Sequence, residues 1–215
     1  MISCPDDQAG GTGKGFARFS VNETKWLPMP TWIFAIFSFL AVIATAHADG
    51  IAEKATLCAS CHGENGVPVD PKVPVIWGQN AGYLYIELRD FKRGARASEM
   101  MAPMVADMSR DDMMALAEYF SKQPWPNLGQ KPASAAIAER AETVANSAQC
   151  SQCHLAGFLG ASLVPRVSDQ SFDYLLATLE AFRSGARANN AWMTELMKAY
   201  SDDDMKALAA YLAGL

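Results

Sequence analysis

Four stretches of the chain place apolar and polar residues with the period of an amphipathic α-helix. In residues 83–92 and 172–182, aromatic and leucine positions recur at i, i+3, i+4 and i+7, which predicts one buried face for each helix. Two later stretches begin at Ser109 and Ser201, each followed by acidic residues, a pattern typical of a capped helix start. Their apolar stripes consist of Met113, Leu116, Ala117 and Phe120, and of Met205, Leu208, Ala209 and Leu212.

Two further helices are expected ahead of the cysteine-containing segments. They cover residues 51–57 and 135–148, and Ser134 is the candidate N-cap of the second. Gly94 and Gly185 follow the amphipathic helices in the position of a C-cap. No stretch has a convincing strand pattern, so we predict an all-α fold with three helices in each half.

The helices recur because the sequence contains an internal repeat, which points to two similar structural units. The offset is 92 for one set of pairs, namely Cys58 and Cys150, Met101 and Met193, Tyr119 and Tyr211. It is 91 for the pairs between them, namely Pro74 and Pro165, Tyr83 and Tyr174, Phe91 and Phe182, Arg96 and Arg187. Each half has about 80 residues, few for an independent apolar core, so a bulky cofactor would supply the missing interior.

The N-terminus is predicted to be a targeting segment. Residues 32–46 are almost continuously apolar, and Ala46-His47-Ala48 matches an A-x-A cleavage site. An uncleaved membrane anchor is the alternative, but a span needs about 20 residues. We therefore expect an N-terminal extension and signal peptide at 1–48, cleaved near Ala48, and a periplasmic mature chain. A first domain at 49–123 and a second at 134–215 are expected on either side of a proline-rich linker at 124–133.

Candidate chemistry lies in two copies of one motif, C-x-x-C-H, at residues 58–62 and 150–154. This pattern is the attachment signature of c-type haem. On a helical turn the two cysteines share one face, so both thiols can reach the vinyl groups of one porphyrin, and the histidine follows beneath the ring. A redox dithiol does not need the histidine twice, and a zinc site would need closely spaced cysteine pairs or a downstream histidine pair.

The cysteine count argues against a disulfide framework, and the net charge argues against one class of partner. Of the five cysteines, four lie in the two motifs and Cys4 lies far upstream, so none remains for a disulfide framework. The formal net charge of −5 argues against nucleic acid as a partner.

Taken together, these features resemble the dihaem cytochrome c4 family. The resemblance is carried by the tandem motifs, by Gly94-Ala95-Arg96 and Gly185-Ala186-Arg187, by Met101-Ala102-Pro103, and by the serine-led last helices. It covers residues 49–215 and implies two tandem class I cytochrome c domains, each wrapped around one covalent haem. It also implies iron ligation by histidine and methionine, and electron transfer in the periplasm.

Four further residues have roles that the resemblance suggests. The carbonyls of Pro74 and Pro165 would accept a hydrogen bond from the haem histidines, although both could be plain loop prolines. Arg96 and Arg187 could pair with haem propionates, although each could equally be a solvated charge beside a helix end.

The two halves differ at one family pattern. The first half keeps it as Gly78-Gln79, and the second half has Ser168-Asp169-Gln170 in its place.

The expected haem contacts follow from the motifs and the repeat. Covalent attachment is expected at Cys58, Cys61, Cys150 and Cys153, with His62 and His154 as iron ligands. Met101 and Met193 are the expected sixth ligands, because each lies 39 residues after its histidine in an irregular segment before the last helix. The other methionines are expected mainly to fill the core.

The predicted function is one-electron transfer, because two haems with both axial positions filled leave no place for a substrate. The expected partners are redox proteins, namely a quinol-oxidising complex, a terminal oxidase or a dehydrogenase, and a peripheral association with the membrane stays open. The alternative is a dihaem electron-transfer subunit of a periplasmic dehydrogenase, such as a flavocytochrome sulfide dehydrogenase or an alcohol dehydrogenase. A dihaem peroxidase would need an open haem, against which the paired methionines argue.

Overall fold

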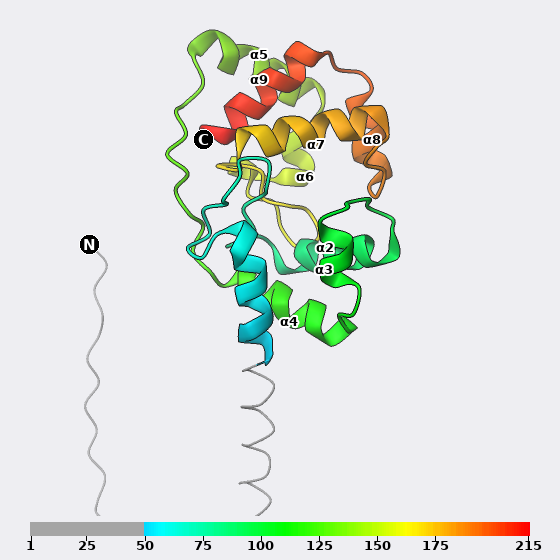
Figure 1. Ribbon diagram of the computed structural model, residues 1–215. Helices are drawn as coiled ribbons and strands as arrows, with labels where there is room; N and C mark the ends of the chain where they lie inside the picture. The colour runs from blue at the N-terminus through cyan, green and yellow to red at the C-terminus, as the bar shows by residue number, and fades with distance from the viewer. Residues whose placement is uncertain (1–49) are drawn as a thin grey trace, which may run out of the picture. The chain divides into compact units, whose positions relative to one another are not determined.

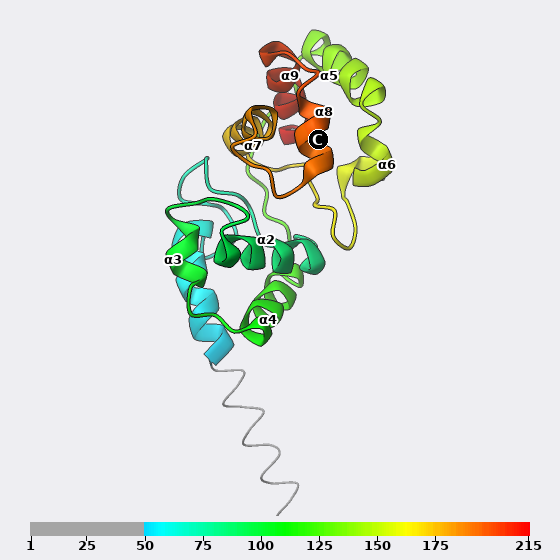
Figure 2. The same ribbon diagram turned by 90° about the vertical axis from the view of Figure 1, so that its right-hand side faces the viewer.

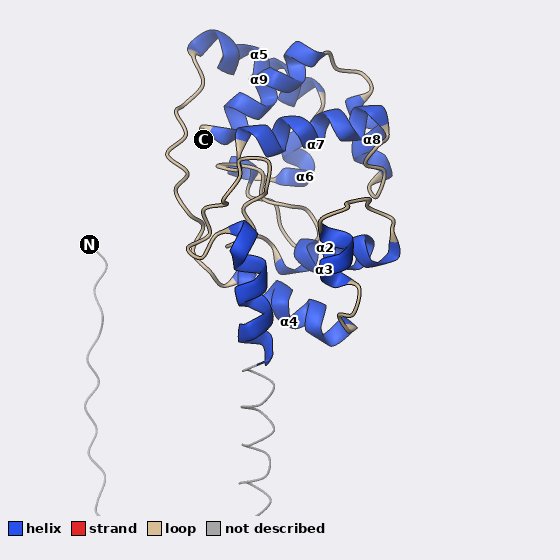
Figure 3. Cartoon of the chain, viewed as in Figure 1, coloured by secondary structure: helices blue, strands red, loops and turns tan. Residues whose placement is uncertain are grey.

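The computed structural model describes residues 50–215; the predicted signal peptide, its cleavage site and Cys4 lie outside the described residues. The described part is helical and contains no strand, only an isolated bridge between Ala161 and Val164 (Figure 3). Its elements are a helix at residues 50–62, α2 (Ala81–Arg93), α3 (Met101–Val105), α4 (Arg110–Ser121), α5 (Ala135–Ser147), α6 (Cys150–His154), the 3-10 turn η1 (Ala156–Phe158), α7 (Phe172–Ser184), α8 (Ala191–Met197) and α9 (Asp202–Ala213). Within this range no helix has both the length and the apolar character needed to cross a membrane.

Two separate hydrophobic cores organise these helices. In the first half α2 packs against α4, and their buried residues include Phe91, Leu116 and Phe120 (Figure 1). In the second half α9 packs against both α5 and α7, around Met205 and Leu208. Each core is built only from residues of its own half, as the sequence repeat predicts.

The predicted helix ends are confirmed at atomic detail. Ser109 accepts a hydrogen bond from the Asp112 backbone N–H, and the Asp112 carboxylate accepts one from the Ser109 N–H, which completes a capping box. Ser201 and Asp204 repeat this arrangement at the start of α9. α2 and α7 both end at a glycine in the left-handed conformation, as expected, with φ of 72° and 79°.

The expectation of three helices in each half was wrong, because the segments before α4 and α9 contain the short helices α3 and α8. α3 packs against α2, and α8 packs against α7 (Figure 2). Both short helices have a cap that the sequence contains: Ser98 Oγ accepts from the Met101 N–H, and Asn190 Oδ1 accepts from the Met193 N–H. Elements of one or two turns are too short to show a helical period, which is why the apolar pattern missed them.

The two C-x-x-C-H segments are built differently. In the first half the motif ends one continuous helix at residues 50–62. In the second half α5 stops at Ser147, as expected, and Gln149 adopts a left-handed conformation (φ 53°, ψ 36°) before α6 carries the motif. Ser134 holds the N-cap position of α5 but makes no side-chain capping bond.

Residues 124–133 form a non-helical connection between α4 and α5. Gln130 fastens this segment to the second half, because its Nε2 donates to the carbonyls of Gln170 and Ala213 at 3.0 Å each. Its Oε1 accepts from the Phe172 N–H at 3.0 Å. The connection is therefore packed along the second half rather than free of contacts.

Candidate haem-binding sites

The helical turn of each motif presents its thiols and its histidine toward one side. Cys58 and Cys150 are half-buried, whereas Cys61 and Cys153 are exposed. Burial raises the pKa of the Cys58 and Cys150 thiols. Both members of each pair are thus accessible from the side of the motif, as covalent attachment to a porphyrin requires.

Each motif histidine is oriented by a backbone carbonyl. His62 Nδ1 donates to the carbonyl of Pro74 at 2.8 Å, and His154 Nδ1 donates to that of Pro165 at 2.9 Å, which confirms the expected role of both prolines. Burial lowers the pKa of both rings, opposed in part by the carbonyl. A neutral imidazole with Nδ1–H fixed in this way presents the Nε2 lone pair, the arrangement typical of a metal-ligating histidine.

Met101 and Met193 differ in exposure from the other methionines of the described chain. Both are half-buried and pack against the edge of their own core. The others are either exposed, namely Met100, Met104 and Met114, or buried within a core, namely Met108, Met113, Met197 and Met205. Burial confirms Met113 and Met205 as core residues, and it leaves Met101 and Met193 at the core edge, where a side chain can turn toward a cofactor.

Three buried side-chain atoms of the described residues have no hydrogen-bond partner, namely Trp77 Nε1, Trp125 Nε1 and Ser168 Oγ. Those of Trp77 and Ser168, which correspond in the repeat 91 positions apart, fit a haem that carries carboxylate groups. A buried donor without an acceptor is rare and destabilising. An acceptor such as a haem propionate in each half would satisfy both atoms, so the residues present fit the cofactor.

Arg96 and Arg187 take part in a buried network between the two halves. Glu87 accepts from Arg96 Nη1 at 2.5 Å and from Arg187 Nη2 at 2.7 Å. Each guanidinium also donates to a tyrosine of the opposite half, Arg96 to Tyr174 and Arg187 to Tyr83, at 3.2 Å. Neither arginine is therefore a solvated charge. The role of Glu87 was not predicted, because the repeat places Thr178 at the corresponding position of the second half.

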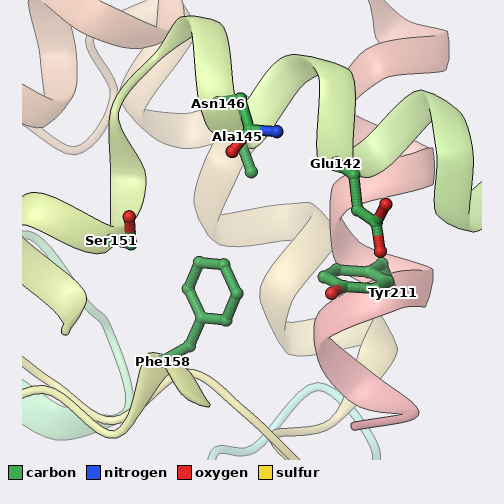
Figure 4. A pocket seen from close by; sticks show the side chains of 6 residues that line it. All are labelled: Glu142, Ala145, Asn146, Ser151, Phe158 and Tyr211. Atoms are coloured by element: carbon green, nitrogen blue, oxygen red, sulfur yellow. The ribbon is translucent and has the colours of Figure 1, made fainter. Parts of the chain in front are cut away.

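A cavity of about 290 Å³ lies beside the second motif (Figure 4). It is lined by Glu142, Ala145, Asn146, Ser151, Phe158 and Tyr211. In Figure 4 the Glu142 carboxylate reaches toward Tyr211, and the Phe158 ring stands between α6 and α9. Ser151 lies within the second motif, whereas Cys150, Cys153, His154 and Met193 are not among the lining residues.

Two helical cores, each with a C-x-x-C-H turn and an oriented histidine, define a two-domain c-type cytochrome. A family model described as Cytochrome c matches residues 138–215. The chain is 37% identical over 177 residues to cytochrome c4 of Thiocapsa roseopersicina, a match that covers 77% of this chain and 91% of that protein. The chain belongs to the cytochrome c4 family, which means two class I cytochrome c domains and two covalently bound haem c groups.

Two further comparisons agree with this assignment. The chain is 35% identical over 178 residues to a thiosulfate dehydrogenase electron acceptor of Stutzerimonas stutzeri, covering 77% of this chain and 82% of that protein. It superimposes on the structure of reduced recombinant cytochrome c4 from Pseudomonas stutzeri with a TM-score of 0.70 at 28% identity. That structural match covers 78% of this chain and 98% of the other.

Proposed function

We propose that the protein is a periplasmic one-electron carrier in which each half holds one six-coordinate haem. The observation that carries the proposal is the repeated pair of candidate axial ligands. Each half has a histidine oriented through Nδ1 and a half-buried methionine 39 residues later. With both axial positions supplied by protein, no site remains for a substrate, and the iron can only change its oxidation state.

We assign the contacts of each haem to its own half. Cys58 and Cys61 attach the first haem, with His62 and Met101 as axial ligands, in a domain at residues 49–123. Cys150, Cys153, His154 and Met193 do the same for the second haem, in a domain at 134–215, and residues 124–133 join the two. The haem supplies the one-electron couple. The neutral thioether of each methionine favours the ferrous state and raises the potential.

A second candidate function is that of an electron acceptor dedicated to one dehydrogenase. The similarity to the thiosulfate dehydrogenase electron acceptor of Stutzerimonas stutzeri favours it, because the name of that protein assigns it to one dehydrogenase. A free carrier and a dedicated subunit would use the same two haems, so they differ in the stability of the complex with the partner. For a free carrier we expect short-lived contacts with a quinol-oxidising complex, a terminal oxidase or a dehydrogenase.

One purification tests export, haem content and partner state together. The native protein, isolated from the periplasmic fraction, should elute alone with the intact mass of residues 49–215 plus two haems, because the signal is cleaved near Ala48 and both haems are attached outside the cytoplasm. Recovery in a stable stoichiometric complex with a dehydrogenase would instead support the dedicated subunit. A mass that includes Cys4, or only one haem, would contradict the proposed processing or the proposed haem content.

A further inference from the structure

Two buried glutamines clamp the backbone of the opposite half in the same way. Gln79 Oε1 accepts from the Arg166 N–H, and its Nε2 donates to the Arg166 carbonyl, both at 2.8 Å. Gln170 Oε1 accepts from the Val75 N–H at 2.9 Å, and its Nε2 donates to the Val75 carbonyl at 3.0 Å. Gln79 and Gln170 are 3% exposed and lie 91 positions apart, so the two clamps are counterparts in the repeat.

The orientation of each glutamine amide is fixed by its partners. A backbone N–H can only face the amide oxygen, and a backbone carbonyl can only face the amide nitrogen. Each Oε1 also accepts from the N–H of the next residue, Asn80 or Ser171, at 2.9 Å. The side chains therefore have no freedom to flip, and each amide makes three hydrogen bonds, two at Oε1 and one at Nε2.

The clamped peptides are the ones that orient the haem histidines. The peptide unit between Pro74 and Val75 contains both the carbonyl that accepts from His62 and the N–H that donates to Gln170. The result is an unbroken chain of two hydrogen bonds through one peptide, from the imidazole of the first half to an amide of the second.

The second half repeats this chain in the opposite direction. The peptide between Pro165 and Arg166 accepts from His154 through its carbonyl and donates to Gln79 through its N–H. Neither chain passes through solvent-exposed side chains, because both glutamines are buried.

We propose that Gln170 is a positioning residue for the axial histidine of the first haem and Gln79 for that of the second, so each half sets the potential of the other half's iron. The inference rests on the proposed assignment of His62 and His154 as iron ligands. Hydrogen bonds in series polarise one another. A glutamine that accepts from the peptide N–H makes the carbonyl a better acceptor, which makes the imidazole a more basic ligand. A more basic ligand favours ferric iron and lowers the potential.

The experiment uses the full holoprotein with Gln170→Met or Gln79→Met, which keep the side-chain length but remove the acceptor. The potential of each haem is followed through its haem methyl NMR resonances. Each resonance is assigned to one haem by its contacts with protein protons of the same half. Gln170→Met should raise the potential of the first haem and leave the second unchanged, and Gln79→Met should do the reverse. Exchange of the His62 Nδ1–H in Gln170→Met should become roughly two- to tenfold faster, as expected for one weakened neutral hydrogen bond.

The matched control is Ser171→Ala. Ser171 Oγ donates to the Pro71 carbonyl of the opposite half and not to the peptide between Pro74 and Val75, so this variant should shift neither potential. The inference would be overturned if the potential changed only at the haem in the same half as the substituted glutamine. It would also be overturned if both potentials changed equally or if neither changed. A wild-type protein without a low-spin histidine–methionine spectrum would instead contradict the proposed ligands themselves.

A second variant keeps the test decisive if Gln170→Met fails to assemble with both haems. Gln170→Asn retains the amide but is one methylene shorter, so its oxygen no longer accepts from the Val75 N–H. The potential of the first haem should rise and that of the second should stay unchanged. Equal rises of both potentials, or no rise, would overturn the inference.

Discussion

Replacing Met101 with alanine is expected to remove the far-red absorption band of a thioether–iron bond from one haem only. The variant should lower that haem's potential and open its sixth position to carbon monoxide. Loss of the soft neutral ligand destabilises ferrous iron. The choice of axial ligands changes the reduction potential over a range of roughly 0.8 V. Visible spectroscopy of the oxidised protein, a redox titration and carbon monoxide binding to the reduced protein measure the three effects.

Neighbouring methionines serve as matched controls. Met100 is 74% exposed and Met104 is 37% exposed, and both flank Met101 within four residues. Met100→Leu and Met104→Leu should leave both far-red bands intact and change the free energy of unfolding by less than about 1.5 kcal/mol. If Met104→Leu abolishes a band that Met101→Leu spares, the ligand of the first half is wrongly assigned.

The same result is expected for Met193 and the second haem. Because each core contains residues of one half only, Met193→Ala should leave the first haem's band in place. The cross-half glutamine clamps reach the histidine side of each haem, so they do not couple the two methionines.

Replacing Glu87 with glutamine is expected to destabilise the holoprotein by about 3–5 kcal/mol, the usual cost of removing one partner from a buried ion pair. The Glu87 side chain is 10% exposed and bridges two guanidiniums whose side chains are 14% and 8% exposed. The glutamine keeps the shape but leaves Arg96 and Arg187 without a buried counter-charge between them. Guanidinium chloride unfolding, followed by far-ultraviolet circular dichroism, measures the change.

Glu118→Gln is the control for this substitution. Glu118 pairs with Lys122 one helical turn away on α4, and both side chains are more than half exposed. Exposed helix pairs of this kind contribute about 0.3–0.5 kcal/mol. A Glu87→Gln variant no less stable than Glu118→Gln would show that the network between the halves does not hold them together.

Local patterns in the sequence were sufficient to predict the main helices and their ends. The stripe of α4, the capping boxes at Ser109 and Ser201, and the terminal glycines Gly94 and Gly185 each depend on residues within a few turns of one another. The short helices α3 and α8 were missed because one or two turns show no period. Their caps, Ser98 and Asn190, were the available signal.

The site was predictable where it depends on spacing and unpredictable where it depends on contacts between the halves. The motif cysteines and histidines follow from the motif and the repeat, and the role of the prolines that orient the histidines followed from the resemblance to the cytochrome c4 family. The contacts between the halves in the Glu87 network and in the glutamine clamps join residues 78–104 positions apart, and no local pattern encodes such pairs. The recurrence of glutamine at 79 and 170, between otherwise different neighbours, was the one trace of the clamps in the sequence.

Carbon monoxide binding to the reduced wild-type protein at neutral pH tests the electron-carrier function most directly. Because a histidine and a methionine are proposed to occupy both axial positions of each iron, we expect little binding at either haem and an unchanged reduced spectrum. Rapid binding of one carbon monoxide per chain would contradict this, because it would reveal an open iron at which a substrate could react.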